Sequence, residues 1–276
     1  MFPATNPWNQ DISNAPLHPN SANYMNAIKS LGGNQFLHAD FGSNTDWGIP
    51  FVVVPSGQAQ LPIHFTAYGD ESDPGPYPVP LNAPVEGGSA SDGDRHVIAF
   101  QQGTCLLYEL YRAFPRLGYW DADSGAKWDL RSNALRPAGW TSADAAGLPI
   151  FPGLVRRDEV QSGQITHALR FTVSRTQKAY VLPATHWASS YTDQNLPPMG
   201  LRLRLKASFD TGAYSGDARV ILEALKKYGM IVADNGSNWY ITGESNGNWD
   251  DDVLNQLKGV PGSAFEVVYT GEVVRP

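Results

Sequence analysis

The sequence predicts a single, mainly β domain over residues 1–276, a β-sandwich or jelly roll with two or three peripheral helices. Three observations favour this fold class. Short apolar runs rich in β-branched and aromatic residues recur along the chain. Glycine and proline separate these runs throughout, and neither gathers into a linker that would divide the chain. Few segments show apolar residues at helical spacing, so we expect β layers to form the core.

Several pairs of β runs are expected to build the sheets. Residues 95–100 and 104–111 lie on either side of a short turn, which predicts a hairpin. Residues 165–173 and 178–184 predict a second hairpin of the same kind. A third is predicted around Asn235–Gly236, because Asn-Gly is the strongest short-range hairpin signal.

The run at 199–208 alternates strictly between apolar and other residues. Its leucines face inward in this prediction, and Arg202, Arg204 and Lys206 face the other way. The basic row would either grip an acidic or sulfated sugar chain or lie in solvent and pair with acidic neighbours. A last strand is expected at 264–270.

Helices are few in this prediction. One is expected from about Ser21 to the glycine pair Gly32–Gly33. A second is expected over 215–229, where Gly229 follows the last turn. A short third helix is expected at 249–259.

The composition excludes several classes of partner. A net charge of −7 and a pI near 5.3 leave no basic surplus, so we expect no nucleic-acid and no anionic-membrane partner. The longest apolar runs are far shorter than the roughly 20 residues of a membrane span. Cys105 is the lone cysteine, and its apolar surroundings are typical of a small buried hydrophobe. We expect a monomer.

Several catalytic signatures are absent from the sequence. It contains no phosphate-binding loop, dinucleotide glycine motif, HExxH motif, GxSxG elbow or CxxC pair. Nucleotide chemistry and serine-elbow esterase chemistry are therefore not expected, and no cofactor is predicted.

The segment from Tyr68 to Pro80 is a stiff acidic loop. Asp70, Glu71 and Asp73 fall within four positions, and four prolines follow them. Crowded carboxylates repel one another unless a cation or ligand offsets their charge, and prolines lower the entropy lost when a loop is ordered. The loop is therefore predicted to form one wall of a polar cleft.

Further carboxylates and histidines occupy turn-rich positions. His38 and Asp40 are two residues apart, and so are Asp94 and His96, so each pair shares one face of an extended segment. Such a pair suits acid/base chemistry or metal ligation, and it equally suits a turn cap or a solvated loop.

Three other positions have two interpretations each. Glu109 shares a strand face with Tyr111, where apolar surroundings would raise its pKa as in a glycosidase acid, or else the face is simply solvated. His186 lies beside Trp187, at a substrate-lined rim or packed on the indole. The proline-stiffened segment 139–154 either plugs one end of a sandwich or forms a cleft wall.

Short segments along the chain resemble an uncharacterised family of exported, single-domain β-rich proteins from soil bacteria and fungi. They are NPWNQDI, HADFG, DESDPGPYP, GDRH, LYELY, SADAAGLPI, HALRFT, PPMG and YGMIVADNGS. The resemblance covers nearly all of the chain and implies export. It implies no particular catalytic residue, substrate or cofactor. Because the first residues lack the pattern of a signal peptide, we expect an extracellular protein whose signal has been removed.

Together these features predict a secreted carbohydrate-active protein, most simply a glycoside hydrolase that acts on a polysaccharide or oligosaccharide with a carboxylate pair. Two alternatives stay open: a non-catalytic carbohydrate-binding module with a structural ion, and a metal-dependent enzyme built on histidine and aspartate. The candidate catalytic residues are Glu71, Asp73, Asp40, Asp94 and Glu109. The candidate substrate-binding residues are His38, His96, His186, Trp187, Tyr77 and Tyr111. The favoured hypothesis assigns no metal ligand.

Overall fold

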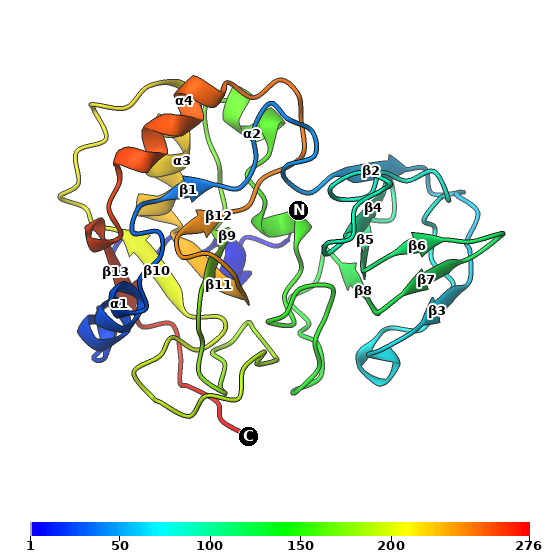
Figure 1. Cartoon of the computed structure of the whole chain (residues 1–276), viewed down its shortest axis with the longest axis horizontal. Helices are drawn as coiled ribbons and strands as arrows, with labels where there is room; N and C mark the ends of the chain where they lie inside the picture. Colours follow the sequence, from blue (N-terminus) through cyan, green and yellow to red (C-terminus); the bar gives the residue numbers. More distant parts are fainter. Residues whose placement is uncertain (1) are drawn as a thin grey trace.

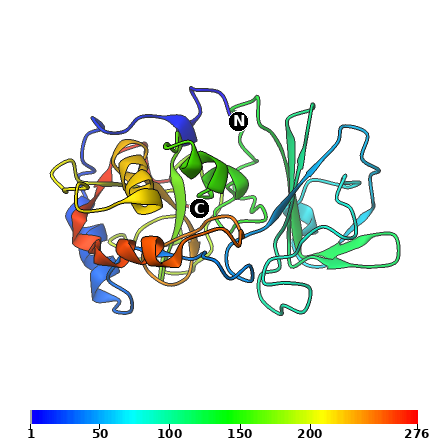
Figure 2. The same ribbon diagram turned by 90° about the horizontal axis from the view of Figure 1, so that it is seen from above.

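Two lobes lie side by side in the computed structural model, which describes residues 2–276 (Figures 1 and 2). The larger lobe contains both ends of the chain, and the middle of the chain, from β2 to β8, forms the smaller lobe. Strands outnumber helices, and all three sheets are mixed, so the expected β-rich fold is confirmed.

A six-stranded sheet forms the centre of the larger lobe, in the order β1-β12-β9-β11-β10-β13. Its strands are β1 (His38–Ala39), β9 (Leu169–Val173), β10 (Arg202–Leu205), β11 (Met230–Asn235), β12 (Tyr240–Ile241) and β13 (Phe265–Val268). The α-helices of the described chain also lie in this lobe: α1 (Ser21–Ser30), α2 (Arg157–Gln161), α3 (Gly216–Lys227) and α4 (Asp251–Asn255) (Figure 1).

The smaller lobe contains a four-stranded sheet, β2-β4-β5-β8, and a three-stranded sheet, β3-β7-β6. Its strands are β2 (Phe51–Val54), β3 (Ile63–Phe65), β4 (Val97–Gln101), β5 (Leu106–Tyr111), β6 (Phe114–Pro115), β7 (Trp120–Ala122) and β8 (Ser124–Asp129). Single turns of 3-10 helix occur in both lobes at η1 (Pro7–Asn9), η2 (Gly69–Glu71), η3 (Phe151–Gly153), η4 (Gln256–Gly259) and η5 (Gly262–Ala264).

Local patterns predict most elements correctly. The hairpin of β4 and β5 is confirmed, as are the strands β10 and β13. The helices α1 and α3 are confirmed, because their apolar residues at helical spacing are buried against the core. The short helix α4 lies within the expected range 249–259 and begins after Asp250, whose carboxylate accepts hydrogen bonds from the N–H groups of Asp252 and Val253.

Two predicted hairpins are wrong, because strands pair with distant partners. Residues 178–184 form only isolated bridges at Tyr180, and β9 pairs instead with β11 and β12. The strands β11 and β12 do flank Asn235–Gly236, but β9 lies between them in the sheet. The jelly roll is not confirmed either, since each of the three sheets includes a parallel pair and jelly-roll sheets are antiparallel.

The basic row of β10 serves the fold. Arg202 is buried, and its guanidinium donates to the carbonyl groups of Pro7, Gln10 and Tyr228. Arg204 pairs with Glu266 at 2.8 Å and donates to backbone carbonyl groups of the N-terminal segment. These two side chains therefore hold the first residues of the chain against the sheet, and they are not free to grip a sugar chain.

An apolar seam joins the two lobes. Ile150, Phe151 and Leu154 pack in one cluster with Ile98 and Leu107 from the four-stranded sheet. The segment that contains them continues into the larger lobe, where Val155 bridges to Gly243. The proline-stiffened segment 139–154 therefore plugs one face of the smaller lobe, and its first half lines the pocket described next.

Candidate functional site

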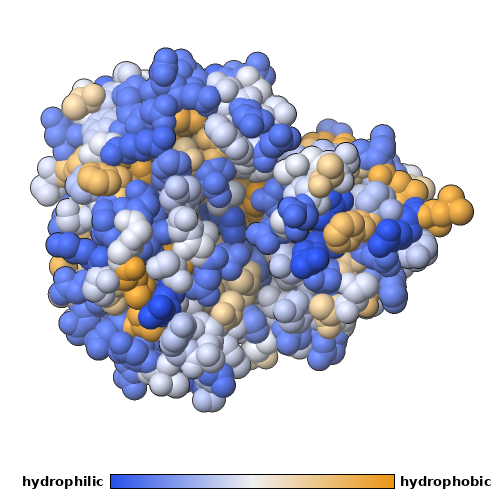
Figure 3. Space-filling model, in the orientation of Figure 1, coloured by the Kyte–Doolittle hydropathy of each residue, from blue (hydrophilic) through white to orange (hydrophobic). Residues whose placement is uncertain are grey.

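A pocket of about 260 Å³ lies between the lobes and draws its lining from both. The surface is of mixed polarity and is hollowed between the lobes (Figure 3). The titratable side chains that line the pocket are Tyr68, Asp94, His96, Tyr111, Asp144, His186 and Asp234. The rest of the lining is made by small residues: Ser124, Thr141, Ser142, Ala143, Ala145 and Ala188.

Asp234 reaches the pocket because β11 carries a β-bulge. Val232 lies opposite Phe171 on β9, but the next paired residue is Asp234, opposite Thr172, so Ala233 is an extra residue. Side chains of a strand alternate between faces, so without the extra residue Asp234 would share the core face of Val232. The bulge moves its carboxylate to the opposite face, where the pocket lies.

The protein environment makes Asp234 a weaker acid than an ordinary aspartate. Burial, followed by the charge of Asp144, raises its pKa to about 7. Arg170 and a hydrogen bond from the N–H of Asn235 to Oδ1 (2.6 Å) lower the pKa, and Asp94 raises it again. A carboxyl group that keeps its proton near neutral pH can act as a general acid.

Asp94 enters the pocket from the smaller lobe. It is exposed and precedes β4. Its carbonyl oxygen accepts a hydrogen bond from the N–H of Arg112 (2.8 Å), the residue after β5. Arg95 and Arg112 both have positive φ, at 50° and 49°, in the left-handed region that side chains other than glycine rarely adopt. Strained backbone of this kind gathers at functional sites, and here it surrounds Asp94.

His96 is held as an imidazolium. Its Nδ1–H donates to Glu86 Oε2 at 2.6 Å, and its Nε2–H donates to the carbonyl oxygen of Ala143 at 2.9 Å. Burial by itself lowers the pKa of His96, but the Glu86 carboxylate outweighs it and raises the pKa to about 9. Both ring nitrogens are occupied, so His96 braces the pocket wall and is not a free base.

A buried ion pair forms the floor of the site. Arg170 on β9 donates to both carboxylate oxygens of Asp144, at 3.2 Å and 2.9 Å, and its third hydrogen bond goes to Thr242 Oγ1. Burial by itself lowers the pKa of Arg170, but Asp144 outweighs it, so the guanidinium stays charged. The pair fixes the segment that carries Asp144 against the sheet.

The acidic loop clamps the wall of the pocket. Glu71 Oε2 accepts a hydrogen bond from the N–H of Thr141 (2.8 Å). The buried Arg136 pairs with Asp73 and donates to the carbonyl oxygens of Glu71 and Thr141. Asp73 also accepts from the N–H of Lys127 at 2.9 Å. The loop is therefore ordered by bonds to the protein itself, and it carries Tyr68 to the mouth of the pocket.

His186 and aromatic rings occupy the rim. The Nδ1–H of His186 donates to the carbonyl oxygen of Ala145 (2.7 Å), and its ring stacks on Trp187 with centroids 5.6 Å apart. Tyr68 is 47% exposed, and Tyr111 lies 5.6 Å from the His96 ring. Flat, partly exposed rings around a polar pocket are surfaces on which sugars stack.

Several sequence-predicted residues lie away from this pocket. Glu109 is fully buried and accepts hydrogen bonds from the N–H groups of Ile150 and Phe151 and from the Trp128 indole. Burial raises its pKa to about 7, but its oxygens are engaged inside the core. Tyr77 is likewise fully buried and donates to the Asp73 carbonyl oxygen. We therefore leave both out of the proposed site.

His38 and Asp40 also lie elsewhere. His38 stacks on Tyr240, with ring centroids 4.2 Å apart, and burial lowers its pKa. Asp40 is exposed and lines a different pocket with Trp47 and Lys258. The structure thus brings Asp94, His96, His186 and Tyr111 together, with Glu71 and Trp187 at the edge.

Sequence reasoning missed Asp234 and Arg170, and it gave Asp144 no role beyond its place in the proline-stiffened segment 139–154. A signal did exist for the first two, since each is a charged residue inside an otherwise apolar strand run. Such a residue is expected to be paired or functional when the strand is buried.

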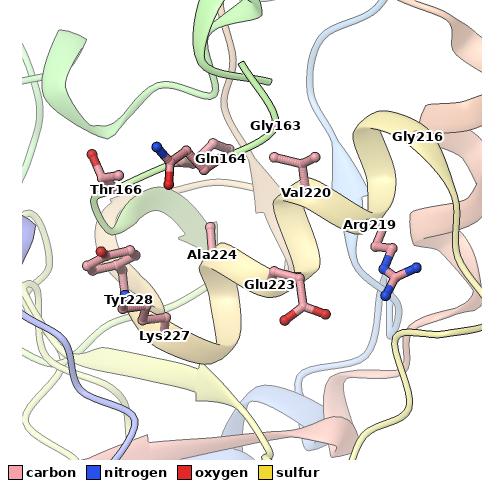
Figure 4. A pocket seen from close by; sticks show the side chains of 11 residues that line it. Gly163, Gln164, Thr166, Gly216, Arg219, Val220, Glu223, Ala224, Lys227 and Tyr228 are labelled. Carbon is pink, nitrogen blue, oxygen red and sulfur yellow. The ribbon is translucent and has the colours of Figure 1, made fainter. Parts of the chain in front are cut away.

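In the described chain, neither a cluster of metal ligands nor the pocket beside α3 provides an alternative site. Among residues 2–276, no group of three or more histidine, cysteine, aspartate and glutamate side chains could hold a metal ion. Figure 4 shows another pocket, between α3 and residues 163–166. Glu223 is the one carboxylate in its lining and accepts a hydrogen bond from Thr211, so that pocket offers no pair of carboxyl groups.

None of the helices in the described chain combines the length and apolar character needed to cross a membrane. Comparisons with models of protein families, with curated proteins and with solved structures found no match.

Proposed function

We propose that the protein is a glycoside hydrolase that acts on a polysaccharide, with Asp234 as general acid and Asp94 as general base or nucleophile. One observation carries the proposal. A carboxyl group with its pKa raised to about 7 opens into the same pocket as an exposed carboxylate from the other lobe. Two carboxyl groups in different protonation states are what glycoside cleavage requires.

Each carboxyl group has a defined part in the reaction. Asp234 donates its proton to the glycosidic oxygen as the bond to the anomeric carbon breaks. Asp94 either removes a proton from an attacking water or attacks the anomeric carbon itself, after which water releases the sugar. The separation of the two groups in the substrate complex selects between these routes.

The surrounding residues support this division of roles. Asp144 raises the pKa of Asp234, and Arg170 keeps Asp144 in place. The exposed ring of Tyr68, together with Tyr111, offers stacking surfaces for sugar rings. Export of the protein, implied by the resemblance in its sequence, would bring it to an extracellular polysaccharide.

The test compares Asp234→Asn and Asp94→Asn with the wild type on a panel of polysaccharides. Hydrolysis is measured by the release of new reducing ends. Each substitution removes a carboxyl group of the proposed pair, so we expect turnover to fall at least about 100-fold, with oligosaccharide binding retained. Asp92→Asn is the matched control, because Asp92 is exposed in the same loop and does not line the pocket.

Turnover at the wild-type level in both Asp234→Asn and Asp94→Asn would contradict the assignment of the pair. Binding of oligosaccharides without any turnover by the wild type would instead favour a non-catalytic binding module.

A further inference from the structure

Glu71 and His186 form an acceptor slot at the wall of the pocket. His186 Nε2 lies 4.0 Å from Glu71 Oε2, and both side chains are partly exposed. The hydrogen bond from Nδ1–H to the Ala145 carbonyl oxygen places the single proton of a neutral imidazole on Nδ1. Nε2 then presents a lone pair, so two acceptors face each other across the slot.

The number of donor hydrogens selects which ligand group can donate to both acceptors at once. A sugar hydroxyl carries one hydrogen and can satisfy only one of them. A protonated amine carries three hydrogens and a positive charge, so it can donate to both and also offset the charge of the carboxylate.

The charges around the pocket favour the same ligand. Lysine and arginine are missing from its lining residues. The cations nearby are already engaged, Arg170 by Asp144 and His96 by Glu86. Neither Asp94 nor Glu71 pairs with a lysine or arginine among the bonds described, which favours a cationic sugar and disfavours a uronate or sulfated sugar.

The 3-10 turn that contains Glu71, η2, also places the ring of Tyr68 near the slot as a stacking surface. The N–H of Glu71 donates to the carbonyl oxygen of Tyr68 (3.1 Å), so the tyrosine and the carboxylate are carried by one turn, η2. A sugar ring against Tyr68 would present its substituents to the carboxylate of Glu71.

We infer that the slot between Glu71 and His186 binds the protonated amine of an amino sugar, so that the substrate is a polysaccharide with free amino groups. The inference rests on the proposed function in taking the ligand to be a polysaccharide. Binding of the amine in the slot is tested separately from hydrolysis.

The test uses chitosan oligosaccharides and fully N-acetylated chitin oligosaccharides of equal length, at pH 7, with the Asp234→Asn variant to prevent turnover. We expect tighter binding of the deacetylated ligand by calorimetry, and a loss of about 10-fold or more when Glu71→Gln is added, corresponding to about 1.4 kcal/mol or more. Binding of the acetylated ligand should change little. Salt should weaken the preference, because the contact is partly exposed.

Asp70→Asn is the matched control, since it removes the same charge from the adjacent, exposed position in η2. His186→Gln provides a second variant, and we expect it to lower the preference for the deacetylated ligand as well. Equal effects of Asp70→Asn and Glu71→Gln would overturn the slot, because they would show only a general attraction to an acidic surface.

The outcomes separate this inference from the proposed function. Hydrolysis of neutral polysaccharides with no preference for amino sugars would overturn the inference and leave the glycoside hydrolase standing. Binding of the deacetylated ligand that depends on Glu71, without hydrolysis of any substrate, would support the slot and contradict the hydrolase. If Glu71→Gln leaves the preference for the deacetylated ligand unchanged, the slot does not bind the amine and the inference is overturned.

Discussion

Ionisation of Asp234 destabilises the folded state, because burial and the charge of Asp144 raise its pKa from 3.8 to about 7. A carboxyl group whose pKa is raised by folding contributes stability that is fully present below its unfolded pKa and is lost as the pH rises through the folded value. For Asp234 this window extends from about pH 4 to about pH 7. Functional sites often hold such destabilising groups.

Asp234→Asn is therefore expected to raise the melting temperature at pH 8 and to leave it nearly unchanged at pH 4. Each kcal/mol gained shifts the midpoint of a domain this large by about 2–4 °C. Calorimetric scans at the two pH values measure the effect. In the wild type, activity should also fall as the pH rises through about 7, because the acid loses its proton. A midpoint difference that is equal at both pH values would contradict the raised pKa.

At the scale of elements, the acidic loop and the pocket wall act as one unit through Arg136. Its guanidinium is almost fully buried and joins Asp73, the Glu71 carbonyl group and the Thr141 carbonyl group. The prolines after the loop then reduce the entropy lost on ordering it. This explains how crowded carboxylates are accommodated: one pairs with an arginine and another accepts a backbone N–H.

Arg136→Ala is expected to lower the free energy of unfolding by about 1.5–3 kcal/mol, since it leaves buried acceptors without their charged donor. It should also lower kcat/KM, because Thr141 and the wall would lose their clamp. Arg131→Ala is the control: Arg131 pairs with Asp129 at the surface, where such pairs contribute little to stability. Chemical denaturation of the two variants gives the comparison. Equal stability losses would show that the clamp is unimportant.

At the scale of the whole molecule, the lobes share the apolar seam around Ile150 and Phe151. The pocket lined by Asp94 and Asp234 lies between the same two lobes, so the seam also sets where these two residues lie relative to each other. Because buried side chains join the lobes, we expect the two lobes to unfold together as a single cooperative domain.

Ile150→Ala is expected to cost about 2–5 kcal/mol, the range for truncating a buried aliphatic side chain, and to leave one unfolding transition. Leu117→Ala serves as the control, because Leu117 is fully exposed and its truncation should change stability little. Differential scanning calorimetry distinguishes the outcomes. Two separate transitions in the wild type would show that the lobes unfold as independent domains.

The sequence by itself determined those structural elements that depend only on residues close together in the chain. The helices α1 and α3, the β4–β5 hairpin and the alternation of β10 follow from periodicity and turn chemistry within short windows. Asp94 and His186 could be singled out because functional side chains gather on loops and strand ends. The order of strands could not be read in this way, because β9 enters between β11 and β12 from more than 50 residues earlier in the chain.

The tertiary structure alone decided the site. One extra residue in β11 turns Asp234 from the core to the pocket, and that bulge exists only in the register with β9. Glu109, a plausible acid in its local sequence, lies buried because the segment of Ile150 and Phe151 packs over it with two N–H donors. Burial and charge set the pKa of both carboxyl groups, and both depend on which distant segments come together.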